Sequence, residues 1–166
     1  MATKPKRGNR GGSAQTRKPA KKAGAVKKAV ARKPAAAAIK PVDIDPGWAW
    51  DDRLPFVQGK QVGNLVYVSG QVALDRDGKL VGEGDIRAQT RQALENVKTI
   101  LAAAGLGLGD IVKLNSYITE AGLYRDFSDE RSKIFGSHRP ASTVVAVSGL
   151  AFPGLMVEIE AIALKQ

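Results

Sequence analysis

The sequence predicts an α+β domain built on one mixed β-sheet with two helices. Five segments between residues 56 and 164 have the apolar patterns of strands, and two segments between them have the three- and four-residue apolar spacing of helices. The predicted order along the chain is β-β-α-β-α-β-β. Helices that connect strands of one sheet usually cover the same face, so the other face should be buried by something else, most simply a partner subunit.

The first two strands form a predicted hairpin. The segments FVQGKQV at 56–62 and LVYVSGQVAL at 65–74 flank the dipeptide Gly63-Asn64, whose residues favour tight turns. The next six residues, DRDGKL at 75–80, have the composition of another turn.

A long helix is predicted between Asp85 and Gly105. Asp85 is an N-cap residue in type, and Gly105 can adopt the left-handed conformation that ends a helix. One helical face should carry the apolar residues Ile86, Ala93, Val97, Ile100, Leu101 and Ala104. The glycines of GLGLGD at 105–110 follow this helix instead of preceding one, which favours a plain connection over a phosphate-binding loop.

The remaining elements alternate between strand and helix. IVKLNSYITE at 111–120 predicts a strand, and YRDFSDERSKIFG at 124–136 predicts a shorter amphipathic helix. Two last strands are predicted in STVVAVSGL at 142–150 and LMVEIEAIAL at 155–164.

A basic arm precedes this domain. Residues 1–40 hold 13 of the 26 Lys and Arg residues and no Asp or Glu, so the arm carries +13 while residues 41–166 carry −3. The arm lacks aromatic residues and has almost no large aliphatic ones, so we expect residues 1–45 to be disordered and residues 46–166 to form the domain. Its composition resembles the tails of linker histones.

Three interpretations of the arm remain open: polyanion binding, an extension without function, and an organelle transit peptide. Lys and Arg clusters without acids attract phosphate without reading sequence. The residues expected to contact nucleic acid are Lys18, Lys21, Lys22, Lys27, Lys28, Arg32 and Lys33.

Composition excludes several classes of chemistry. The chain has no Cys, which excludes disulfides, thiolate nucleophiles and Cys-based zinc sites. Its single His, His138, disfavours His-rich metal sites and Ser-His-Asp triads. We expect no metal, no cofactor, no secretory signal and no membrane span, and hence a cytoplasmic protein.

Several motifs, in order and spacing, resemble the RidA/YjgF family, also called YER057c-like or L-PSP endoribonuclease-like. The resemblance covers about 55–164. It rests on Val68-Ser69-Gly70-Gln71, on the segments at 84–105 and 109–119, on HRPAST at 138–143 and on VEIEAIAL at 157–164. It implies a chorismate-mutase-like fold and a homotrimer with clefts between neighbouring subunits. The implied activity is hydrolysis of reactive enamines and imines to 2-keto acids and ammonia.

The resemblance also implies a set of cleft residues, with one departure. Family members with this activity read P-A-R-S or P-A-R-T where this chain reads Pro140-Ala141-Ser142-Thr143, so Ser142 replaces the arginine that holds the substrate carboxylate. Arg139 could substitute for it, or could be an ordinary surface arginine. Glu158 matches the family's acidic residue and is the candidate water-orienting base. The remaining substrate-binding candidates are Phe56, Ser69, Gly70, Ser128 and Thr143.

Three functions follow as hypotheses. The first is an imine or enamine hydrolase with altered or weakened activity because of Ser142. The second is a non-catalytic trimer that binds a small metabolite in its interfacial cleft, and the third is a nucleic-acid-associated protein that acts through three arms.

Overall fold

The computed structural model describes residues 38–48 and 53–166. The seven arm residues proposed to contact nucleic acid lie outside these ranges. The helices and strands are β1 (Val42–Ile44), β2 (Gly59–Val62), β3 (Leu65–Val72), α1 (Ile86–Ala103), β4 (Ile111–Ile118), α2 (Tyr124–Phe135), β5 (Ala141–Ala146) and β6 (Val157–Leu164).

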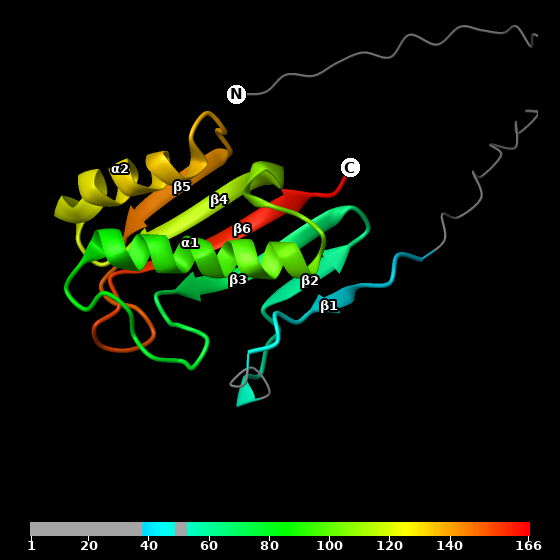
Figure 1. Ribbon diagram of the computed structural model, residues 1–166, viewed down its shortest axis with the longest axis horizontal. Helices are drawn as coiled ribbons and strands as arrows, with labels where there is room; N and C mark the ends of the chain where they lie inside the picture. Colours follow the sequence, from blue (N-terminus) through cyan, green and yellow to red (C-terminus); the bar gives the residue numbers. More distant parts are fainter. Residues whose placement is uncertain (1–37, 49–52) are drawn as a thin grey trace, which may run out of the picture. The chain divides into compact units, whose positions relative to one another are not determined.

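The strands form one mixed sheet in the order β1-β2-β3-β6-β4-β5. Neighbouring strands are antiparallel except β4 and β5, which are parallel and are connected through α2. In Figure 1 both helices lie on the same side of the sheet, with α2 alongside the β5 edge. The prediction of an α+β domain with two helices on one face is confirmed.

The sheet begins earlier along the chain than we expected. The domain was expected to start at residue 46, but β1 spans Val42–Ile44 and pairs with β2, with Val42 opposite Gln61 and Ile44 opposite Gly59. Ile44 is buried in the core, because its side chain lies beside the Gly59 backbone, where no side chain competes for the space.

The first helix has the boundaries that the sequence predicts. The Asp85 carboxylate accepts hydrogen bonds from the backbone N–H groups of Arg87 (2.9 Å) and Ala88 (3.1 Å), which would otherwise lack partners at the helix start. Gly105 has a φ of 75°, which ends the helix. All six apolar residues predicted for one face are buried: Ile86, Ala93, Val97, Ile100, Leu101 and Ala104.

Alternation along the central strands separates a core face from an uncovered face. On β6, Val157, Ile159, Ala161 and Ala163 are buried under the helices, while the side chains between them point the other way. On β4 the buried residues are Ile111, Leu114, Ser116 and Ile118. We call the opposite surface, formed by residues such as Tyr117, Glu158 and Glu160, the open face of the sheet.

Within the described part of the chain, no helix is both long and apolar enough to span a bilayer.

Candidate functional site

Two glutamates of β6 lie on the open face. Glu158 and Glu160 are two residues apart on one strand, so they project on the same side, as the sequence predicts. Glu160 is held in place, because its Oε1 accepts hydrogen bonds from Asn115 Nδ2 at 2.7 Å and from the Tyr117 hydroxyl at 3.3 Å. These contacts fix the orientation of the Glu160 carboxylate, whose charge acts on the nearby Glu158 carboxyl.

The Glu158 carboxyl lies against the backbone of Gly70. A Cβ atom at Gly70 would overlap this carboxyl and would come within 2.8 Å of its Cδ, so the close approach requires glycine. Burial raises the pKa of the Glu158 carboxyl above its usual value, and the charge of Glu160 raises this pKa further. The structure thus places Glu158 on the open face with a raised pKa, and its role as the water-orienting base stays a prediction.

Ser69 and Thr143 are also on the open face, on either side of Glu160. Ser69 lines a cavity of about 220 Å³ together with Lys113 and Glu160, and its hydroxyl donates to the Val57 carbonyl at 2.7 Å. Thr143 Oγ1 accepts a hydrogen bond from Lys113 Nζ at 2.7 Å. Lys113 was not predicted, although the alternation of β4 already places it on the face of Glu158.

Ser142 points to the other side of the sheet. It pairs with Leu114, which is buried under the helices, and its Oγ accepts a hydrogen bond from Arg131 Nη1 at 2.6 Å. Arg131 comes from α2, and its guanidinium also lies over the Phe127 ring, 5.7 Å from the ring centroid. A guanidinium thus occupies the surroundings of Ser142, supplied by a helix instead of by β5.

Arg131 is a second residue that sequence reasoning missed. The sequence feature that could have identified Arg131 is its spacing of three residues from the candidate Ser128, because residues three apart lie on one face of a helix. Ser128 is half-buried on α2, one turn before Arg131. Arg139, the candidate substitute for the lost arginine, is exposed and lines a cavity with Arg131.

The described candidates fall into two groups that one chain does not bring together. Ser69, Gly70, Thr143 and Glu158 belong to the open face, whereas Ser142 and the residues of α2 lie on the helix side. Phe56 precedes β2 and is 54% exposed, so it belongs to neither group. A site that uses both groups has to form between two copies of the chain.

Among residues 38–48 and 53–166, no cluster of three or more His, Asp or Glu side chains is arranged to hold a metal ion.

Comparison with known proteins gives consistent matches. A family model described as Endoribonuclease L-PSP matches residues 49–165. A RutC family protein of Pyrococcus horikoshii is 39% identical over 113 residues, which cover 68% of this chain and 88% of that protein. A Salmonella typhimurium protein named 2-iminobutanoate/2-iminopropanoate deaminase is 42% identical over 119 residues, with the same two coverages.

Solved structures resemble the fold. A putative endoribonuclease from Thermotoga maritima is 38% identical with a TM-score of 0.70, and the match covers 75% of this chain and 98% of that one. Escherichia coli TdcF, solved with bound serine, is 35% identical with a TM-score of 0.63, and the match covers 68% and 90% of the two chains.

Proposed function

Since the chain belongs to the endoribonuclease L-PSP family, also called the RidA/YjgF family, we propose that it hydrolyses imines or enamines derived from 2-amino acids. Its substrate preference differs from that of the deaminases that carry an arginine at the position of Ser142. The name of the Salmonella relative and the serine bound by TdcF support a small substrate that carries a carboxylate.

The reaction requires little apparatus. Water adds to the imine carbon as a carboxylate accepts its proton, and the resulting carbinolamine then loses ammonia when the C–N bond breaks and the proton passes to nitrogen. An enamine first becomes the imine by taking a proton on carbon. One water is consumed, and a 2-oxo acid and ammonia are released with no change in oxidation state.

Glu158 carries the proposal. Its carboxyl is half-buried, lies against Gly70 and has a raised pKa. A carboxyl whose pKa lies closer to neutral can both accept the proton of water and return it to the leaving nitrogen. Within the described ranges, Glu158 forms neither an ion pair nor a side-chain hydrogen bond that would occupy it.

Imine consumption tests the proposal directly. An amino-acid oxidase generates the 2-imino acid in the cuvette, and semicarbazide traps the imine that the protein has not removed. We expect Glu158→Gln to lower kcat about 100-fold or more, because it removes the proton-transferring group. The matched control is Glu83→Gln at an exposed site before α1, which should leave kcat unchanged.

Two results would separate the alternatives. Turnover that survives Glu158→Gln would exclude Glu158 as the base. Absence of turnover in the wild type, together with saturable binding of 2-oxo acids, would favour the second hypothesis, a metabolite-binding trimer.

We propose that the site forms between subunits of a homotrimer. The two groups of candidates lie on opposite faces of the sheet, so a single chain cannot present both to one ligand. Tyr67 and Val145 lie on the open face, and each remains 43% exposed. Burying such side chains against another subunit would stabilise the assembly.

The charge of the arm supports a second function, non-specific binding of nucleic acid. The arm's +13 contrasts with the −3 of residues 41–166. Three arms on one trimer would bind a polyanion more tightly than one, because the first contact raises the effective concentration of the others.

A further inference from the structure

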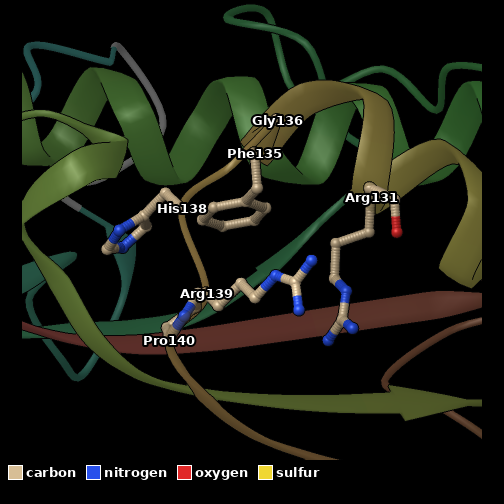
Figure 2. Close-up of a pocket in the computed structure, with 7 residues that line it drawn as sticks. Arg131, Phe135, Gly136, His138, Arg139 and Pro140 are labelled. Carbon is tan, nitrogen blue, oxygen red and sulfur yellow. The ribbon is translucent and has the colours of Figure 1, made fainter.

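The junction between α2 and β5 contains a cavity with two arginines. The cavity has a volume of about 340 Å³, and Arg131 and Arg139 both line it. Figure 2 shows the two guanidinium groups extending into the same space from the helix and from the segment that leads into β5. The volume is within the range typical of sites for small ligands.

The positive charge of this cavity is not balanced within the described part of the chain. None of the described residues that line the cavity is acidic, and neither arginine forms an ion pair with a described residue. Two guanidinium groups that share a concave space repel each other unless an anion lies between them. The cavity is therefore suited to a ligand with negative charge.

Arg131 is oriented before any ligand arrives. Its Nη1 donates to Ser142 Oγ at 2.6 Å, and the guanidinium lies over the Phe127 ring. These two contacts restrict the side chain and leave Nη2 free of described partners. A preoriented guanidinium binds a carboxylate with a smaller loss of side-chain entropy. Ser142, which cannot hold a carboxylate by charge, positions an arginine that can.

The other walls of the cavity include two stacked rings and a proline. His138 Nε2 donates to the Ile111 carbonyl at 2.9 Å, and the imidazole stacks on Phe135 with the ring centroids 6.0 Å apart. Phe135 and Pro140 supply an apolar surface for a short carbon chain. The cavity thus offers two guanidinium groups and an apolar surface beside them.

We propose that this cavity binds small dicarboxylates, with one carboxylate on Arg131 and the other on Arg139. If the protein hydrolyses imines as proposed above, this site selects 2-imino dicarboxylates as its substrates. These are the imines of amino acids with acidic side chains. A monocarboxylate ligand would leave one arginine without a counter-charge, which explains a preference for two carboxylates.

Binding of the reaction products tests the site without relying on turnover. Isothermal titration of the full-length protein compares 2-oxoglutarate, 2-oxobutanoate and inorganic phosphate. We expect 2-oxoglutarate to bind roughly tenfold or more tightly than 2-oxobutanoate, since one additional charged hydrogen-bonded pair accounts for such a factor. Phosphate should bind more weakly than 2-oxoglutarate, because it makes no contact with the apolar wall that Phe135 and Pro140 supply.

Four variants separate the roles of the residues. Arg131→Gln should weaken the binding of both oxo acids roughly tenfold or more. Arg139→Gln should remove the preference for 2-oxoglutarate and leave the affinity for 2-oxobutanoate unchanged. Ser142→Ala should weaken both by a smaller factor, because the charge stays but its orientation is lost. Arg125→Gln is the matched control, an exposed arginine on α2 outside the cavity, and should change neither affinity.

Several results would overturn the proposal. These are equal affinities of the wild type for the two oxo acids, an equal loss in Arg125→Gln and Arg131→Gln, or phosphate binding as tight as that of 2-oxoglutarate. Turnover assays with imines generated from glutamate and from 2-aminobutanoate test the dicarboxylate preference separately from the proposed hydrolysis. Glu158-dependent turnover without a dicarboxylate preference would refute the proposal and leave hydrolysis standing. The expected binding without any turnover would refute hydrolysis and leave the site standing.

Discussion

Glu130 of α2 connects the two helices through a buried carboxylate. Its side chain is 7% exposed and accepts hydrogen bonds from Arg91 of α1 at 2.9 Å and from Lys133 at 3.1 Å. Arg87 of α1 lies 3.8 Å away and also binds Asp126 at 2.7 Å. Because Arg131 follows Glu130 directly, the same carboxylate fixes the helix turn that carries the proposed anion site. We therefore predict that Glu130→Gln destabilises the fold.

The expected magnitude follows from the exposure of the partners. Two charged hydrogen bonds would contribute about 3–6 kcal/mol at values typical of well-shielded pairs. The side chains of Arg91 and Lys133 are 53% and 66% exposed, so they recover hydration once the carboxylate is removed. We expect the free energy of unfolding to fall by about 1–2 kcal/mol at pH 7. Glu95→Gln, which removes an exposed pair with Lys98, is the control and should cost less than about 0.5 kcal/mol.

The effect should depend on pH with a defined sign. The hydrogen bond from Arg91 and, to a smaller extent, the one from Lys133 hold the pKa of Glu130 below its usual value. The stabilisation is therefore complete above the ordinary pKa of Glu, about 4.3, and disappears as the pH falls through the lower pKa of the folded state. Urea denaturation at pH 7 and pH 3, at one protein concentration, measures the difference between wild type and Glu130→Gln. A difference that persists undiminished at pH 3 would refute this account.

Three further predictions concern the site, the arm and the assembly. Gly70→Ala should lower kcat about as far as Glu158→Gln does, because the new Cβ displaces the flexible Glu158 carboxyl, and it should cost at most about 1 kcal/mol of stability. Normal turnover in Gly70→Ala would show that this contact is unimportant. Deleting residues 1–40 should abolish salt-sensitive binding of labelled duplex DNA in fluorescence anisotropy, and equal affinity of the truncated chain would make the arm a passive extension. Sedimentation equilibrium should give about three times the 17.6 kDa chain mass, and a stable monomer at micromolar concentration would contradict the interfacial site.

The elements that could be predicted from the sequence are those whose signals are local. Asp85 and Gly105 mark the two ends of α1 by their own backbone chemistry, and Gly63-Asn64 marks the turn between β2 and β3. By contrast, β1 was not predicted, because three residues are too short to show a period. It is a strand only because the edge of β2 offers backbone partners, which the sequence of β1 does not reveal.

The candidate site divides in the same way. The alternation of β6 was enough to place Glu158 and Glu160 on one face, opposite the core residues between them. The contact between Glu158 and Gly70, and the hydrogen bond from Arg131 to Ser142, join residues far apart in the sequence or on different elements. No local pattern encodes such contacts, so a resemblance that follows the strand motif alone finds Ser142 and overlooks Arg131.

The placement of Glu158 and Arg131 on opposite sides of the sheet has a consequence for mixed assemblies. Each subunit of the proposed trimer would contribute its open face to one cleft and its α2–β5 edge to another. Two chains, each impaired in a different half of the cleft, could then complement each other. When Glu158→Gln and Arg131→Gln subunits assemble at random in equal amounts, about one cleft in four receives an intact half from each. Co-expression of the two variants would then give more activity than either variant has alone.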